Sequence, residues 1–198
     1  MCIRDSLHIH CHNDFGLATA NALQAFQLGV RCVDVTINGL GERCGLPPLA
    51  EVVAALDELF KIDHSWNLKK LKKMSSYIDR ITKMDNRYTR PITGKYSFSH
   101  KAGIHVSAML KNQSSYQSMS PEKLNRRHKI IIDKYTGRKA IQYRLEQLKI
   151  EYDEQLIDNI VLEIKRNPIV TNWTDKEIMR LAEKFLFTKS EIAKSSIS

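Results

Sequence analysis

Two strand patterns, each followed directly by a helix pattern, occupy the first sixty residues and most constrain the fold of this chain. Residues 7–14 and 30–38 alternate or are rich in β-branched side chains, so each predicts a strand. Apolar residues at helical spacing follow over 17–28, ended by Gly29, and again over 49–60. Two successive βα units predict parallel strand pairing, the construction of a parallel sheet or a β/α barrel.

After residue 61 the sequence is mainly helical, with one irregular section before residue 134. Within that section Ser120 is followed by proline, which predicts a short helix because proline is favoured at the first helical position. A capping box of Thr174 and Glu177 marks the start of a later helix. The three longer helices are predicted over 137–148, 153–166 and 174–186.

The chain of 198 residues carries 31 Lys and Arg against 22 Asp and Glu, a net charge of +9. Its densest basic run, residues 67–74, spaces Leu68, Leu71 and Met74 along one helix face with lysines around them, which is typical of a solvated helix. The run carries no nucleic-acid-binding motif, so we expect no nucleic-acid partner.

Neither a signal peptide nor a stretch of eighteen apolar residues is present, and the four cysteines form no C-x-x-C pair. We therefore expect no membrane association and a cytoplasmic location.

Three histidines alternate along the first predicted strand, at His8, His10 and His12. Side chains two residues apart lie on one face of a strand, and two imidazoles so placed can bind one divalent ion. A structural or surface role is the alternative reading of an H-x-H pattern alone. The second strand ends at Thr36 and Asn38 before a glycine-rich turn, where barrel enzymes carry their catalytic groups, so Asn38 is a further candidate ligand.

The residues after this turn, Glu42 and Arg43, favour a structural ion pair over a catalytic role.

Four ordered motifs together carry a resemblance to a known family. Residues 10–14 (HCHND) and 36–43 (TINGLGER) resemble strands seven and eight of the isopropylmalate, homocitrate and citramalate synthases. Residues 99–105 (SHKAGIH) and 110–116 resemble the segment that follows the barrel in that family. The match runs in order from about residue 7 to residue 186.

The resemblance implies an α/β fold made of the last two βα units of a TIM barrel, strands seven and eight, followed by mainly helical C-terminal subdomains. Residues 7–62 are then the C-terminal part of the catalytic barrel, 63–134 a linker and subdomain I, and 135–198 a helical subdomain II. A full barrel needs about 250 residues, so we expect a fragment that is inactive when isolated. Residues 1–6 are expected to be non-native, because MCIRD is the translation of a sequencing-library adapter.

In this family a divalent cation (Zn, Mn or Mg) binds a 2-oxo acid, which condenses with acetyl-CoA. The resemblance implies that His10 and His12 are metal ligands, with Asn38 a possible further ligand and Thr36 a group that holds the substrate carboxylate. It also implies that His105 and Tyr116 are catalytic and act from a subdomain that swaps onto a partner's barrel, and hence a homodimer in the full-length enzyme.

A homocitrate synthase that uses 2-oxoglutarate is the favoured reading, because residues 100–103 (HKAG) resemble that branch. A 2-isopropylmalate synthase or a citramalate synthase is the alternative, and metal-dependent lyases and aldolases with this barrel are a runner-up class. A non-catalytic helical binding module that retains remnants of a barrel is the alternative from another class.

Overall fold

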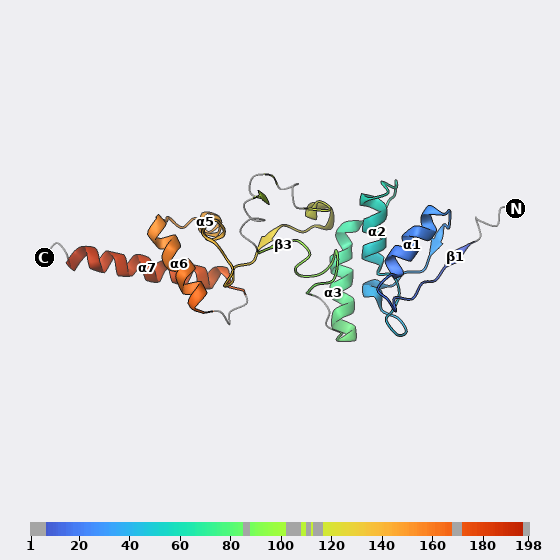
Figure 1. The fold of residues 1–198 in the computed structure, drawn as a ribbon, viewed down its shortest axis with the longest axis horizontal. Helices are drawn as coiled ribbons and strands as arrows, with labels where there is room; N and C mark the ends of the chain where they lie inside the picture. Colours follow the sequence, from blue (N-terminus) through green and yellow to red (C-terminus); the bar gives the residue numbers. More distant parts are fainter. Residues whose placement is uncertain are drawn as a thin grey trace. The chain divides into compact units, whose positions relative to one another are not determined.

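The structure is a computed structural model that describes residues 7–84, 88–101, 108–109, 112, 117–167 and 172–195 (Figure 1). The chain divides into two compact units. Unit 1 comprises Met1–Phe98 and Met119–Arg127, and unit 2 comprises Ser99–Ser118 and His128–Ser198.

Unit 1 begins with a pair of parallel strands, β1 (His8–Ile9) and β2 (Cys32–Val33), in which His8 lies opposite Cys32. The strands are joined through the helix α1 (Ala18–Gln27), which is the predicted βα connection (Figure 1). Parallel pairing is thus confirmed, but each strand is much shorter than predicted.

The backbone beyond these strands bonds to the glycine-rich loop instead of continuing the ladder. The N–H of Asn13 donates to the carbonyl of Gly45 at 2.9 Å, and the N–H of Thr36 donates to that of Pro47 at 3.1 Å. A β-branched run therefore leaves the sheet early, because its hydrogen-bonding groups find partners in the loop.

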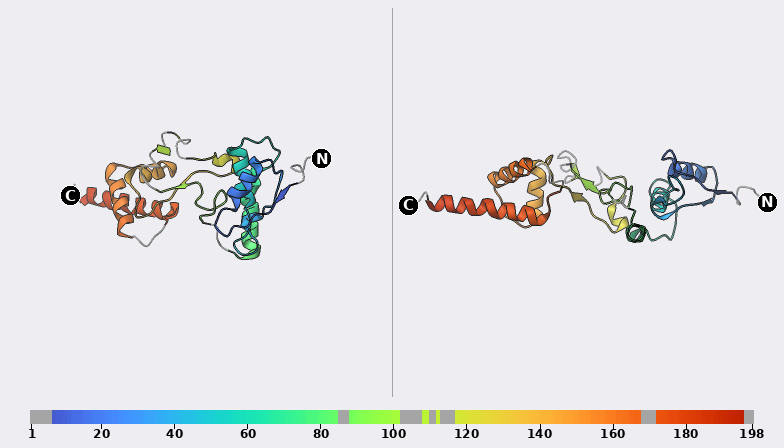
Figure 2. Two further views of the ribbon diagram at one scale, coloured as in Figure 1. Left: turned by 45° about the vertical axis from the view of Figure 1, so that its right-hand side comes forward. Right: turned by 90° about the horizontal axis from the view of Figure 1, so that it is seen from below.

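The two helices that follow the strands end close to where the sequence predicts. α1 is followed by Gly29 at a φ of 100°, a left-handed conformation that glycine adopts without steric cost. α2 (Leu49–Glu58) packs against α1, and the hydroxyl of Thr19 donates to Glu51 at 2.8 Å between them. Both views in Figure 2 show these helices side by side.

Residues 63–84 and 88–98 pack with the first βα units. The 3-10 turn η3 (Leu68–Lys70) leads into α3 (Leu71–Thr82), and both leucines are buried in one cluster with Val53 and Ala54 of α2. Lys69, Lys70 and Lys73 are exposed, so the predicted solvated face is confirmed. This packing divides the chain after Phe98, whereas the sequence places the boundary near residue 62.

The short helix predicted after Ser120 is the 3-10 helix η5 (Pro121–Leu124), which packs against η3 in unit 1. Leu124 is fully buried there.

In unit 2 the described residues include a second parallel strand pair, β3 (Ser99–His100) and β4 (Lys129–Ile130), and the three predicted longer helices. These helices, α5 (Arg138–Gln147), α6 (Glu154–Arg166) and α7 (Asp175–Ser195), begin within one residue of their predicted starts. The predicted capping box is confirmed, since the N–H of Thr174 donates to the Glu177 carboxylate at 2.7 Å and the N–H of Glu177 to the Thr174 hydroxyl at 3.4 Å.

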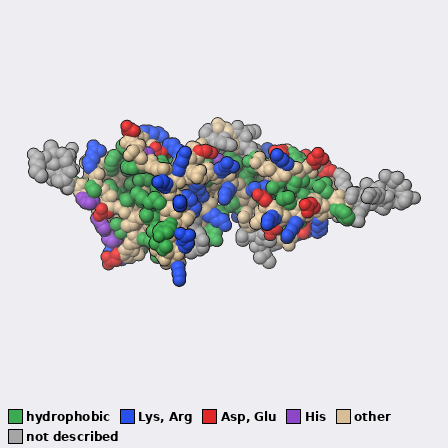
Figure 3. All heavy atoms as spheres, turned by 180° about the vertical axis from the view of Figure 1, so that it is seen from behind, with side chains coloured by type: hydrophobic (Ala, Val, Ile, Leu, Met, Phe, Trp, Pro, Cys, Tyr) green, Lys and Arg blue, Asp and Glu red, His purple; other side chains and the backbone are tan. Residues whose placement is uncertain are grey.

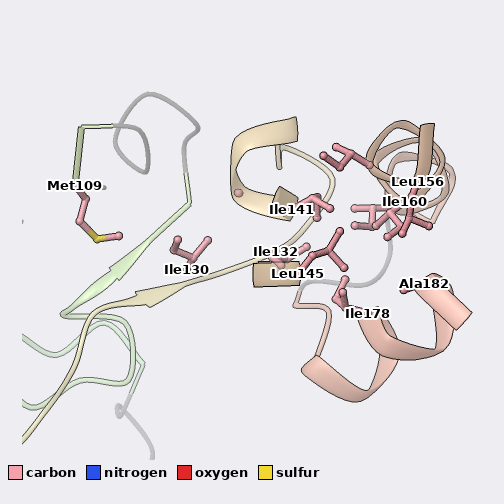
Figure 4. Close-up of a cluster of buried hydrophobic side chains, with 12 residues drawn as sticks. Met109, Ile130, Ile132, Ile141, Leu145, Leu156, Ile160, Ile178 and Ala182 are labelled. Carbon is pink, nitrogen blue, oxygen red and sulfur yellow. The ribbon is translucent and has the colours of Figure 1, made fainter. Parts of the chain in front are cut away.

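The core of unit 2 is made mainly of branched aliphatic side chains, which come from all three helices and from Ile130 and Ile132, and α6 contacts both α5 and α7 (Figure 4). Its fully buried members include Ile141 and Leu145 of α5, Ile157, Ile160 and Ile164 of α6, and Ile178 of α7.

The described part of the chain is a mixture of helices and short parallel strands and contains no closed barrel. None of its helices is long and apolar enough to cross a membrane. Cys11, Cys32 and Cys44 are free thiols.

One lysine forms ion pairs between two parts of unit 1 that are distant in sequence. The Nζ of Lys123 lies 2.8 Å from Oδ2 of Asp57 and 2.7 Å from Oε2 of Glu58 at the end of α2. The hydrogen bond from Lys123 lowers the pKa of the Asp57 carboxyl, with a smaller contribution from His64, and likewise lowers the pKa of Glu58. Both carboxyl pKa values are lower in the folded state than in the unfolded state. The ion pairs therefore stabilise the fold fully at a pH above the ordinary carboxyl pKa, and this stabilisation is lost as the pH falls through the lowered pKa values.

We predict that Lys123→Gln lowers the free energy of unfolding by roughly 0.5–1 kcal/mol at neutral pH and by much less near pH 3. Urea unfolding of the wild type and the variant at the two pH values measures this difference. Lys61→Gln is the control, because Lys61 pairs with Glu58 alone and is more exposed, so its effect should be smaller. A loss of the same size at both pH values would contradict the assignment.

We predict that Ile160→Ala lowers the free energy of unfolding by about 2–5 kcal/mol. The side chain of Ile160 has 0% exposure, so its truncation leaves a cavity in the core of unit 2. The matched control is Leu162→Ala on the same helix, where the side chain is 48% exposed and the expected loss is about 0.5 kcal/mol. Thermal or urea unfolding monitored by circular dichroism compares them, and equal losses would be inconsistent with this orientation of α6.

Candidate active site

β2 and the two residues after it, Asp34 and Val35, have one face in apolar surroundings and one face in polar surroundings. Val33 and Val35 line an apolar cavity of about 470 Å³ whose other walls come from α1, α2, η3 and α3. The side chains of Cys32 and Asp34 contact histidines instead. Because successive strand residues point to opposite faces, the candidate polar site lies on the face away from the cavity.

The three alternating histidines lie on this polar face, as the sequence predicts. Nε2 of His8 is 2.9 Å from one carboxylate oxygen of Asp34, and Nδ1 of His10 is 2.8 Å from the other. The rings of His10 and His12 are 5.2 Å apart between centroids and meet edge to face. Figure 3 shows histidine side chains gathered at the surface near the N-terminal segment.

Asp34 is the site residue that sequence reasoning missed. Its pKa is lowered first by the hydrogen bond with His10 and further by His8, so the carboxylate form is favoured. The available signal was an acidic residue inside the β-branched run of residues 30–38. Alternation places it on a face, but only the strand register places it beside His10.

His12 has a buried ring nitrogen, Nδ1, without a hydrogen-bond partner in the structure. A buried polar atom left unpaired costs about 1–3 kcal/mol, which a bound ligand can offset. The paired imidazoles of His10 and His12 therefore fit a divalent ion in the chemistry of their donors. Within the described ranges no group of three or more His, Cys, Asp or Glu side chains could hold a metal ion.

The backbone of Thr36 is hydrogen-bonded, whereas its side-chain hydroxyl is not. Its carbonyl accepts from the N–H of Leu49 at 2.8 Å, at the start of α2. Its Oγ1 is buried and has no hydrogen-bond partner in the structure. A buried hydroxyl free to donate fits the predicted contact with a substrate carboxylate.

The side chain of Asn38 is held by α3. Asn38 lies in the 3-10 turn η2 (Ile37–Gly39) at a left-handed φ of 64°, and its Nδ2 donates to the carbonyl of Ser75 and to Asp79, each at 2.9 Å. The same carboxylate pairs with the buried Arg90 at 2.9 Å. A role of Asn38 at the ion thus remains a prediction, and the structure assigns its amide to this network.

Arg43 forms an ion pair in the structure, and its partner is Asp14. The guanidinium donates three hydrogen bonds of 3.0–3.2 Å to the Asp14 carboxylate and lowers the pKa of that group. The loop that carries Arg43 requires Gly45, which has a φ of 82° and whose added Cβ would overlap the carbonyl of Gly39.

The predicted catalytic residues His105 and Tyr116 lie outside the described residues. Nearby in sequence, Nε2 of His100 is 3.0 Å from Nδ1 of His128, whose Nε2 is 2.9 Å from Oε1 of Gln117. These three side chains form a polar row within unit 2.

We predict that Asn38→Ala lowers the free energy of unfolding by about 2–3 kcal/mol, since it keeps the strained φ and removes two hydrogen bonds, one to the carbonyl of Ser75 and one to the Asp79 carboxylate. Asn38→Gly should lose less, because glycine relieves the backbone strain while removing the same amide. Urea denaturation of both variants gives the comparison. If glycine proved as costly as alanine, the left-handed conformation would not contribute.

Two family models match the chain, and together they cover most of it. The model described as HMGL-like matches residues 3–78, and the model described as homocitrate synthase post-HMGL domain-like matches residues 92–169.

Several curated relatives are similar over nearly the same segment. The homocitrate synthase of Sulfurisphaera tokodaii is 41% identical over 175 residues, which is 88% of this chain and 38% of the relative. That of Saccharolobus solfataricus is 42% identical over 176 residues, 89% of this chain and 38% of the relative. The homocitrate synthase AksA of Methanopyrus kandleri is 36% identical, over 87% of this chain and 44% of the relative.

The chain spans about two fifths of the length of these relatives. The order of the two matched segments agrees with the order of the motifs, with the histidine face in the first and β3 and β4 in the second. By these matches the chain belongs to the HMGL-like homocitrate synthase family.

Proposed function

We propose that this chain forms the C-terminal part of an acyltransferase that condenses acetyl-CoA with a 2-oxo acid to give a 2-hydroxy acid and free CoA. In this proposal β1 and β2 are strands seven and eight of a TIM barrel, and the helices of unit 2 belong to the C-terminal subdomains. The observation that carries it is the unpartnered Nδ1 of His12 beside His10, in a chain whose relatives are named homocitrate synthase.

The proposed 2-oxo acid is 2-oxoglutarate. The names of the relatives and the HKAG sequence at residues 100–103 support this choice over 2-oxoisovalerate or pyruvate.

His10 and His12 are proposed to hold a divalent cation, Zn, Mn or Mg, with Asn38 as a possible further ligand. When bound, such a cation supplies Lewis acidity toward the ketone of the substrate. Thr36 is proposed to donate its free hydroxyl hydrogen to the substrate carboxylate, which would satisfy the buried Oγ1.

His105 and Tyr116 are proposed to move protons during the reaction. An imidazole exchanges a proton near neutral pH, and a tyrosine hydroxyl can donate a hydrogen bond to a developing oxyanion. The proposed full-length enzyme is a cytoplasmic homodimer.

A chimera tests the proposal, because the chain covers 38% of the relative's length. Residues 7–195 replace the matching segment of the Sulfurisphaera tokodaii homocitrate synthase. We expect release of CoA thiol from acetyl-CoA only with a divalent cation, with 2-oxoglutarate preferred over 2-oxoisovalerate and pyruvate. The unmodified relative, assayed in parallel, is the positive control.

In the same chimera His12→Ala should lower the rate of thiol release at least about a hundredfold through loss of the cation. His64→Ala is the matched control, since His64 contacts Asp57 and Trp66 away from the site and should leave the rate nearly unchanged. A folded chimera that releases no thiol with any of the three acids, or one insensitive to both chelator and His12→Ala, would refute the proposal.

A further inference from the structure

One carboxylate joins two of the three alternating histidines. Asp34 contacts His8 through Oδ1 at 2.9 Å and His10 through Oδ2 at 2.8 Å, so each oxygen has its own imidazole. The contact with His10 follows from the strand register, because the N–H of Asp34 donates to the carbonyl of Ile9 at 2.9 Å and sets the two side chains on the same face.

The two histidines reach this carboxylate through different ring nitrogens. His10 uses Nδ1, whereas His8 uses Nε2, which also lies 3.0 Å from the sulfur of Cys32. An ionised carboxylate only accepts hydrogen bonds, so the nitrogen that faces it must carry the hydrogen. A neutral imidazole has a single N–H, which leaves the lone pair on Nε2 of His10 and on Nδ1 of His8.

This arrangement separates histidines that the sequence pattern alone treats as equivalent. The outer nitrogen of His10, Nε2, then keeps its lone pair, through which an imidazole can bind a ligand. His8 has that same outer nitrogen occupied by Asp34 and Cys32. Of the two imidazoles that contact Asp34, only His10 therefore keeps its outer nitrogen available to an ion.

We propose that Asp34 is the positioning residue of the metal site: it fixes His10 as the Nδ1–H tautomer with Nε2 free to bind the cation, and it occupies Nε2 of His8, so that His8 does not bind the cation through this nitrogen. The cation in this inference rests on the proposed function, whereas the tautomers are a property of the chain by itself. Carboxylate contacts to the far nitrogen of a metal-binding histidine orient the ring and raise its basicity.

Nitrogen NMR of the 198-residue chain without metal tests the tautomers directly. Long-range correlations of ¹⁵N-labelled imidazoles, recorded at about pH 8, should show His10 as Nδ1–H and His8 as Nε2–H. Asp34→Ala should shift His10 toward the Nε2–H form that predominates for free imidazole side chains, and Asp34→Glu should restore the wild-type form. Finding His10 as Nε2–H in the wild type would overturn the proposal without recourse to any variant.

Zinc titration against a competing chelator then tests the consequence for binding. Asp34→Ala should weaken binding by about ten- to a hundredfold, whereas His8→Gln should leave the affinity within about twofold of the wild type. An equal loss in both variants would make His8 a ligand and overturn the proposal, as would unchanged affinity in Asp34→Ala.

The two proposals fail separately. A chimera that releases no thiol, in a chain whose His10 is Nδ1–H and depends on Asp34, would refute the proposed reaction and leave the role of Asp34 in place. The opposite result, an active chimera with a His10 tautomer indifferent to Asp34, would refute the positioning role alone.

Discussion

The parallel register of β1 and β2 is the constraint on which the candidate site depends. It sets His8 opposite Cys32 and continues so that Asp34 meets His10, which turns side chains 24 residues apart into direct neighbours. The same alternation directs Val33 and Val35 toward the helices. A shift of one residue would exchange the two faces and place the acid in apolar surroundings, where a charged group is strongly disfavoured.

The helices could be predicted from the sequence because their signals are local. Gly29 ends α1, Thr174 and Glu177 open α7, and the apolar spacing marks the buried side of each helix. The strands were predicted too long for a different reason. Thr36 has a β-branched side chain, which favours a strand, but its backbone groups form hydrogen bonds with the loop that follows. A local sequence pattern does not predict this partner.

Within the candidate site, the sequence identified side chains but not their partners. The three histidines share a face as alternation requires, yet Asp34 emerged only from pairing between strands. Asn38 illustrates the converse. Its position before a glycine-rich turn suggests a ligand, whereas Asp79 and Ser75, some forty residues further on, bind its amide through packing that no short motif encodes. The motifs for His105 and Tyr116 identify a family segment, and the roles of those residues remain predictions.

The buried Nδ1 of His12 and Oγ1 of Thr36 have a thermodynamic consequence for the whole of unit 1. Groups that lack partners in the ligand-free chain destabilise its native state, and a molecule that satisfies them binds the native state in preference to the unfolded one. Occupancy and folding are then linked equilibria. A ligand that satisfied both atoms would therefore raise the free energy of unfolding of unit 1.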